Sequence, residues 1–350
     1  MNYIKSFKKR KSNKFNFFII VTGVVVAIML IFMTPSNKII SSKEINNYTE
    51  VENMIEDISK YIVGISRDSI DSSSIWGSGI IVSKSGYIVT NAHVVGEKNS
   101  KCNVMVDDKN SYEGTVVWAS DSIDLAVVKI NVELSNCINI VDSEKIKIGQ
   151  EVFSIGNPIS KSFQKTVSKG IVSGLNRSLE YEENGTKYYM SNLIQTDTAI
   201  NYGSSGGALI DCMGNLIGIN TIKISDAELM SFAVRADIIK PIIEKLNDTG
   251  KFEESGLKIW CFDRYNVYES NTTKKIDSGI LVAKIEENSN VEKAGLRVGD
   301  VIKYIDTDEV NTIVGLKKII FQKDIGDKII LKINRNNKEM FINVELEKIE

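Results

Sequence analysis

Residues 195–209 read QTDTAINYGSSGGAL, and this stretch decides how the chain is interpreted. Three glycines surround two adjacent serines, Ser204 and Ser205, and glycine allows the positive φ angles of tight turns. A serine in such a turn is exposed, and the neighbouring backbone N–H groups can stabilise an oxyanion. Taken alone, a cluster of glycine and serine is more often an ordinary loop. Other residues must therefore decide between a loop and a nucleophile.

A nucleophilic serine needs a base and a group that orients the base, and the chain offers one candidate for each. His93 is the sole histidine of the sequence and follows the β-like stretch 87–89, whereas Asp124 directly precedes the apolar stretch 125–130. Separately, these are ordinary features: a surface or core histidine and a turn residue at a strand end. Together with Ser205 they follow the order His, Asp, Ser of chymotrypsin-like proteases, which favours serine catalysis.

The composition is that of an ordinary globular protein. Of 350 residues, 43% are hydrophobic and 25% are charged, which excludes a chain disordered throughout. The net charge of −2 gives no basic excess that would indicate a nucleic-acid partner. The four cysteines form no CxxC pair and one histidine cannot build a His-rich metal site, so no metal or cofactor is expected. Cys102 and Cys137 fit either a disulfide bridge or two free thiols, and free buried thiols are favoured.

The N-terminal segment has the pattern of a membrane anchor. Residues 1–14 are basic and carry no acid, and residues 15–33 are almost entirely apolar. That run is close to the ~20 residues that cross a bilayer as a helix. The positive-inside rule then places residues 1–14 in the cytoplasm and the later residues on the opposite side. A cleaved signal peptide is the alternative, but the run is long for one and no A-x-A site follows.

After a polar linker at residues 34–52, short β-branched runs alternate with turn residues, which predicts an all-β sandwich or barrel. The predicted strands lie at 62–65, 79–83, 87–90, 103–106, 115–119, 125–130, 151–155, 170–174, 193–196, 208–210, 216–220 and 231–234. Asp237 is a candidate N-cap for a helix that runs to Leu246 and is ended by Gly250. A linker at 249–256 then separates a second, smaller β-rich unit.

With these residues in place, region 53–248 resembles the HtrA/Deg family of serine proteases, which implies the double β-barrel fold of trypsin. The resemblance rests on the following motifs, in family order: WGSGII at 76–81, GYIVTNAHVV at 86–95, DLAV at 124–127, IGNP at 155–158, GIVS at 170–173 and QTDTAINYGSSGGAL at 195–209. The family commonly has Pro-Gly-Asn before the nucleophile and Gly-Gly-Pro after it. Here the chain has Tyr202-Gly203-Ser204 and Gly206-Gly207-Ala208, and neither departure removes a catalytic group.

The resemblance implies a role for each site residue. Ser205 attacks the scissile carbonyl, His93 takes its proton and returns it to the leaving amine, and Asp124 orients the imidazole. The N–H groups of Gly203 and Ser205, with Ser204 as a further candidate, form the oxyanion hole.

The substrate pocket follows from the same register. In a trypsin fold the floor of the S1 pocket is six residues before the nucleophile, which is Ala199, next to Ile200. Neither carries a negative charge, so small or medium apolar P1 residues are expected rather than Lys or Arg. Thr221, Ile222 and Lys223 are expected to line the pocket, and residues 222–232 resemble the family's loop that lines it. The family's long regulatory loop is expected at 177–192.

Residues 257–350 resemble a PDZ domain, on the strength of SGILV at 278–282 and VEKAGLRVGDVI at 291–302. PDZ domains capture the C-terminus of a peptide as an added strand. The groove is expected near Ile259, Trp260, Cys261 and Phe262, where the usual glycine of the carboxylate-binding loop is missing. A purely structural or protein-docking role is the alternative. Cys261 is no evident nucleophile, because no second histidine exists to activate it.

The sequence therefore predicts a membrane-anchored serine endopeptidase whose protease and PDZ domains face the extracytoplasmic side. Its expected partners are misfolded or regulatory exported proteins and peptide C-termini, and the family resemblance implies a homotrimer. Two alternatives are a chaperone or peptide-binding scaffold with little protease activity, and a receptor that only senses peptide C-termini. The intact set of His93, Asp124 and Ser205 argues against a loss of protease activity, whereas the receptor alternative depends on whether the PDZ unit alone accounts for function.

Overall fold

The computed structural model describes residues 42–67, 77–107, 109–157, 164–183, 186–223, 229–266 and 276–349. The basic segment 1–14 and the expected membrane segment 15–33 lie outside the described residues. Among the helices that are described, none is both long and apolar enough to cross a bilayer. Residues Val51–Glu350 form one compact unit.

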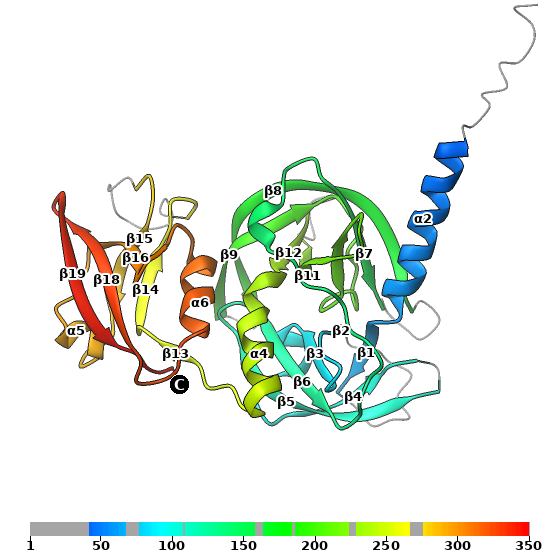
Figure 1. Ribbon diagram of the computed structural model, residues 1–350, viewed down its shortest axis with the longest axis horizontal. Coiled ribbons are helices and arrows are strands. Elements are labelled where there is room, and N and C mark those ends of the chain that lie inside the picture. The colour runs from blue at the N-terminus through cyan, green and yellow to red at the C-terminus, as the bar shows by residue number, and fades with distance from the viewer. Residues whose placement is uncertain are drawn as a thin grey trace, which may run out of the picture. The chain divides into compact units, whose positions relative to one another are not determined.

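Six strands form a closed barrel in the first half of this unit (Figure 1). Their order around the barrel is β1-β2-β3-β6-β5-β4. The strands are β1 (Ile62–Ser66), β2 (Gly77–Ile81), β3 (Tyr87–Thr90), β4 (Lys101–Met105), β5 (Ser111–Ser120) and β6 (Leu125–Ile130). A one-turn helix, α3 (Ala92–Val95), follows β3. Leu125, Val127 and Val128 on β6 are fully buried, which explains the unbroken apolar run of that strand.

A second closed barrel follows, with the order β10-β11-β12-β9-β8-β7 (Figure 1). Its strands are β7 (Glu151–Gly156), β8 (Thr166–Glu183), β9 (Thr186–Thr196), β10 (Ala208–Asp211), β11 (Leu216–Lys223) and β12 (Ser231–Arg235). The short 3₁₀ helix η1 (Ser143–Lys145) precedes β7. The expected mostly-β double barrel is therefore confirmed, and each of the twelve predicted runs overlaps an observed strand.

The segment 177–192, expected as a long loop, is instead largely paired. Strands β8 and β9 extend as a hairpin in which Leu179 faces Met190 and Glu183 faces Thr186. The sequence between Glu183 and Thr186 is Asn-Gly, which is the dipeptide that most favours a two-residue hairpin connection. This signal was available in the sequence and would have predicted the hairpin.

The helices differ from the sequence expectation in two places. Helix α2 (Ser42–Ser59) occupies the second half of the expected linker, and Val51, Met54, Ile55 and Ile58 pack against the hydrophobic core at helical spacing. The 3₁₀ helix η3 (Ala236–Ile239) precedes α4 (Lys240–Thr249). Asp237 is therefore not the N-cap of α4, because it lies inside η3 and its carboxylate pairs with Lys318. Gly250 ends α4 in a left-handed conformation, as expected.

The C-terminal unit is a sheet with the order β14-β15-β16-β18-β19, in which β17 pairs with β16. Its elements are β14 (Ile259–Phe262), β15 (Ile280–Ile285), α5 (Asn290–Lys293), β16 (Val301–Ile305), β17 (Asp308–Glu309), α6 (Ile313–Phe321), β18 (Lys328–Arg335) and β19 (Lys338–Glu345). A separate pair joins β13 (Ser255–Gly256) to β20 (Glu347–Lys348), so part of the expected linker at 249–256 belongs to this unit.

Helix α6 contributes to two hydrophobic clusters. Leu316 and Ile320 lie in the core of the C-terminal unit, whereas Val314 and Phe321 join the cluster formed by both barrels and α4. Phe321 meets Trp118 of β5 and Phe252 edge-to-face, with ring centroids 6.1 and 5.7 Å away. The C-terminal unit thus packs against the barrels through α6, and hydrogen bonds from Asn192 to Asp263 and from Asn266 to Ser191 also join it to β9.

Candidate active site

The first barrel brings His93 and Asp124 together at one end of two paired strands. His93 lies in α3 just after β3, Asp124 lies just before β6, and the pairing of Thr90 with Ala126 joins these strand ends. The Nδ1 atom of His93 is 2.9 Å from each carboxylate oxygen of Asp124. An imidazole held in this way by a carboxylate has its tautomer and orientation fixed for proton transfer from a substrate-facing group.

Asp124 is itself held by the groups around it. Its side chain is 4% exposed, and its φ of 49° lies in the left-handed region that an aspartate tolerates better than most residues. Its carboxylate accepts hydrogen bonds from the His93 backbone N–H at 3.1 Å and from Thr221 Oγ1 at 2.5 Å. Asn91 Nδ2 donates to the Asp124 carbonyl at 2.8 Å. These contacts compensate the burial of a charged carboxylate.

Ser205 comes from the second barrel, in the connection between β9 and β10. Its hydroxyl donates to the carbonyl of Thr221 at 2.9 Å. Thr221, on β11, therefore contacts both Ser205 and Asp124, and it was expected from the sequence only as part of the substrate pocket. A hydroxyl can rotate about its bond, and catalytic hydrogen bonds often tighten only when substrate is bound. The arrangement supplies a nucleophile, a base and an orienting carboxylate at one place.

The backbone around Ser205 forms a tight turn. The Ser204 N–H donates to the Asn201 carbonyl at 2.8 Å, and Gly203 has a φ of 88°, as the third residue of a type II turn requires. The Ser204 N–H is thereby engaged inside the turn and is removed from the expected set of oxyanion donors. Within the described residues, the N–H groups of Gly203 and Ser205 donate to no protein acceptor.

The two glycines after Ser205 are required by close backbone approaches. A Cβ on Gly206 would lie 2.1 Å from the Ser78 carbonyl oxygen, and one on Gly207 would lie 2.5 Å from that of Ile155. Ser78, on β2 of the first barrel, also donates from its N–H to the Ser205 carbonyl at 2.7 Å and from its hydroxyl to the Gly203 carbonyl at 2.8 Å. The first barrel therefore clamps the backbone of the serine turn.

The expected pocket residues lie next to this turn. Ala199 is exposed, its carbonyl accepts a hydrogen bond from Ser168 Oγ at 3.2 Å, and Ile200 is buried at 2% exposure. Thr221 is 4% exposed and serves Asp124 and Ser205 as described above. Ile222 and Lys223 continue β11, but their side chains lie outside the described residues.

The structure places Ile259, Trp260, Cys261 and Phe262 together on β14, the end strand of the C-terminal sheet. Among the described strands, β14 pairs with β15 alone. Trp260 is 55% exposed, and the Lys284 ammonium lies 4.5 Å from the centre of its ring. Ile259 and Cys261 pack instead against the core of the C-terminal unit.

The four cysteines are free thiols. Burial raises the pKa of the Cys102 thiol to about 11 and that of Cys261 to about 12. Because the thiolate is the nucleophilic form, neither side chain is reactive near neutral pH.

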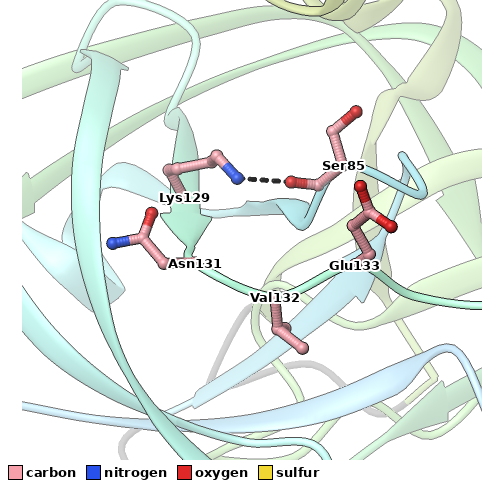
Figure 2. A pocket seen from close by; sticks show the side chains of 5 residues that line it. All are labelled: Ser85, Lys129, Asn131, Val132 and Glu133. Atoms are coloured by element: carbon pink, nitrogen blue, oxygen red, sulfur yellow. Dashed lines mark hydrogen bonds between the residues drawn. The ribbon is translucent and has the colours of Figure 1, made fainter.

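A shallow surface pocket of about 280 Å³ lies at the far end of β6 from Asp124 (Figure 2). It is lined by Ser85, Lys129, Asn131, Val132 and Glu133. The Lys129 ammonium donates to the carbonyls of Ser85 and Ile130 and lies 5.2 Å from the centre of the Tyr87 ring. Lys129, the one cation that lines this pocket, is thus already bound to protein groups. The pocket is separate from the candidate active site.

The double barrel is the fold of a trypsin-like serine endopeptidase, and the comparisons with known proteins give the same class. Residues 77–219 match the model of the trypsin-like peptidase domain, and residues 269–346 match that of the PDZ domain. The chain is 32% identical over 332 residues to the serine protease Do-like HtrB of Bacillus subtilis, covering 87% of this chain and 72% of that relative. It is 33% identical to the serine protease Do-like HtrA of the same organism, covering 86% and 74%.

Solved structures agree with these relatives. The HtrA-type protease AlgW with a tripeptide has a TM-score of 0.63 at 27% identity, covering 86% of this chain and 97% of that chain. The serine endoprotease from Yersinia pestis has a TM-score of 0.58 at 26% identity, covering 86% and 98%. The chain belongs to the HtrA family of serine proteases.

Proposed function

We propose that His93, Asp124 and Ser205 are the catalytic triad of this endopeptidase. The observation that carries the proposal is the pair of 2.9 Å contacts between His93 Nδ1 and the buried Asp124 carboxylate, beside a serine whose backbone is clamped by Ser78. In this mechanism, the Ser205 hydroxyl attacks the scissile carbonyl while His93 accepts its proton. His93 then protonates the leaving amine, and Asp124 stabilises the transient imidazolium.

The backbone N–H groups of Gly203 and Ser205 are the proposed oxyanion donors. Both lie in the turn that Gly203 shapes, and neither is engaged by a described protein acceptor. A water-poor hole of two N–H donors stabilises the tetrahedral intermediate by several kcal/mol, which is often the largest single contribution to such a reaction.

The proposed substrates carry a small or medium apolar residue at P1. Ala199 and Ile200 stand where a trypsin-like pocket has its floor, and neither side chain can pair with Lys or Arg. Thr221 is removed from the list of pocket walls, because its hydroxyl is committed to Asp124. Ile222 and Lys223 remain proposed pocket residues.

The PDZ domain is proposed to bind peptide C-termini along the open edge of β14. An edge strand leaves backbone N–H and C=O groups that an added strand can pair with, and the exposed Trp260 ring offers an apolar contact. The HtrA-type protease AlgW has been solved with a decapeptide and with a tripeptide, which supports peptide binding in this family. The family also supports an oligomer, and we propose a homotrimer.

The chain is further proposed to be a single-pass membrane protein with residues 1–14 in the cytoplasm and the protease and PDZ domains outside. The support is the basic and then apolar sequence of residues 1–33. In this position the enzyme would cleave misfolded or regulatory exported proteins. Carbonate extraction of membranes, followed by protease accessibility on intact cells, tests both the anchor and its orientation.

The activity is tested with the full-length chain in mild detergent, using unfolded β-casein as substrate and mass spectrometry to identify the products. Cleavage by the parent but not by Ser205→Ala or His93→Ala supports the triad. Products that end in Val, Ala or Ile support the apolar pocket, whereas products that end in Lys or Arg contradict it. If the parent remains inactive even with an apolar C-terminal peptide added, the triad assignment is contradicted and a binding scaffold is favoured.

A further inference from the structure

Arg67 directly follows β1, and its guanidinium reaches helix α3, which carries His93. Its Nε atom donates to the Val94 carbonyl at 2.7 Å, and its Nη2 atom donates to the carbonyl of His93. We propose that Arg67 is a positioning residue that fixes the backbone of the catalytic base. This inference rests on the proposed function, because it takes His93 to be that base.

Helix α3 is too short to satisfy its own carbonyl groups. The last four carbonyls of any helix lack a partner within the helix, and α3 has only four residues. The Gly96 N–H closes the turn by donating to the Ala92 carbonyl at 2.7 Å. The next two carbonyls, of His93 and Val94, are the two that Arg67 binds. A cationic side chain is well suited to the last carbonyls of a helix.

The backbone of His93 is consequently held from both sides. Its N–H donates to Asp124 Oδ1 at 3.1 Å, and its carbonyl accepts from Arg67. The backbone sets the direction of the Cα–Cβ bond, so both contacts influence where the imidazole lies relative to Asp124. Releasing the carbonyl would allow α3 to shift while the rest of the barrel stays folded.

Arg67 is attached to a rigid part of the first barrel. Strand β1 pairs with β2 on one side and with β4 on the other, and Ile65 and Ser66 are almost fully buried. The Arg67 side chain therefore extends from the end of a strand that is paired on both sides, and its guanidinium joins that strand to α3.

The chemistry of the contact requires an arginine. A planar guanidinium can present two N–H groups to two neighbouring acceptors at once, whereas a lysine ammonium is a point donor on a flexible stem. We therefore expect activity to fall in the order Arg67, Arg67→Lys, Arg67→Met. Methionine retains an unbranched apolar stem and removes both donors.

The test compares these variants as full-length chains on a fluorogenic peptide substrate. Active sites are titrated to completion with a serine-directed fluorophosphonate, so that kcat is expressed per functional enzyme. We expect Arg67→Met to lower kcat about ten-fold or more, since small displacements of a catalytic group are costly, with KM within about two-fold. Arg67→Lys should recover part of the loss. The control is Lys101→Ala, which removes an exposed cation that pairs with Glu113 on the same barrel.

If Arg67 only stabilised the fold, Arg67→Met would have fewer active sites that react with the fluorophosphonate, or a lower Tm. The kcat per reactive site would then be unchanged. An unchanged kcat per site in Arg67→Met therefore overturns the proposal, as does a full loss in Arg67→Lys that equals the loss in Arg67→Met. The parallel variant His93→Ala separates the two levels of inference. If His93→Ala is inactive while Arg67→Met is fully active, only the role of Arg67 is wrong. If His93→Ala retains activity, the proposed triad and this inference both fail.

Discussion

The first and second barrels follow the same strand order, yet they contribute different parts of the site. Read from β7, the second barrel runs β7-β8-β9-β12-β11-β10, which repeats the order β1-β2-β3-β6-β5-β4 of the first. The first barrel carries the proposed base and its carboxylate in short connections beside β3 and β6. The second barrel carries the proposed nucleophile between β9 and β10. The chemistry is therefore located in the connections and not in the shared framework.

The two barrels also differ in what they attach to. In the first barrel, Ser78 and Asp124 face the second barrel and bind its serine turn and Thr221. The second barrel has the long β8–β9 hairpin and is followed by η3, where Asp237 pairs with Lys318 of α6. The first barrel thus holds the turn that carries the proposed nucleophile, which belongs to the second barrel. Helix α6 of the PDZ domain contacts both barrels, through Trp118 of β5 and Asn192 of β9.

Removing the nucleophile should have the largest effect. We expect Ser205→Ala to lower kcat by about 10⁵-fold or more, because the residual rate then comes from binding and oxyanion contacts alone. Peptide hydrolysis measured at matched concentrations of folded protein tests this. Ser204→Ala is the matched control in the second barrel, since Ser204 is engaged mainly through its backbone N–H, and it should retain most of the activity. Equal losses in both variants would contradict the register of the nucleophile.

Removing the charge of the first barrel's carboxylate should have the next largest effect. We expect Asp124→Asn to lower kcat about 10⁴-fold, because an amide no longer fixes the tautomer of His93 or stabilises its imidazolium. The measurement is the same hydrolysis assay with circular dichroism to confirm folding. The control is Asp121→Asn, an exposed aspartate three positions earlier, which should remain near the parent activity. If Asp124→Asn lowered kcat only modestly, Asp124 would orient His93 without its negative charge contributing much to the rate.

The contact between the second barrel and the PDZ domain should affect stability more than chemistry. Lys318 Nζ lies 2.8 Å from Asp237 Oδ2, and the Asp237 side chain is only 2% exposed. Lys318→Met leaves this buried carboxylate with Arg235, whose Nε lies 3.9 Å from Asp237 Oδ1, as its remaining cation among the described residues. We expect a loss of about 3 kcal/mol in the free energy of unfolding. Denaturant titration measures it.

A double variant makes that prediction specific. Combining Lys318→Met with Asp237→Asn also removes the buried charge that lost its ammonium partner, so much of the lost stability should return. If the double variant is as unstable as Lys318→Met alone, the loss arises from packing of α6 and not from the buried charge. kcat at temperatures well below unfolding should remain close to that of the parent in either case.

The link between the barrels through Thr221 should give the smallest of these effects. Thr221→Val removes one hydrogen bond to a buried carboxylate, which is worth about 1.5–3 kcal/mol, and we expect kcat to fall roughly ten-fold or somewhat more. Thr221→Ser keeps the hydroxyl and should restore most of the rate. An unchanged kcat in Thr221→Val would show that the first barrel orients Asp124 without help from the second.

Local sequence patterns predicted many of the strands and turns of this molecule. The twelve short β-branched runs predicted the strands of a β sandwich or barrel, and the glycines around Ser205 predicted its tight turn, because these features depend on neighbouring residues. The resemblance to the HtrA/Deg family implied the double barrel. The chain order of His93, Asp124 and Ser205 favoured serine catalysis, and the structure brings the first two side chains together. The Asn-Gly dipeptide of the β8–β9 hairpin was also present in the sequence, but the family resemblance led to the prediction of a loop at 177–192.

Contacts between distant residues could not be read in the same way. Thr221 and Asp124 are 97 positions apart, Lys318 and Asp237 are 81 apart, and Arg67 and His93 are 26 apart. The side-chain types at these positions are compatible with many surface roles. Only barrel closure and the docking of α6 place each donor beside its acceptor. The sequence by itself determined the strands, the turns and the chemical groups of this protease, since local conformation depends on local residue type. The tertiary structure decided which polar groups hold those reactive groups in place, because it alone brings remote segments within hydrogen-bonding distance.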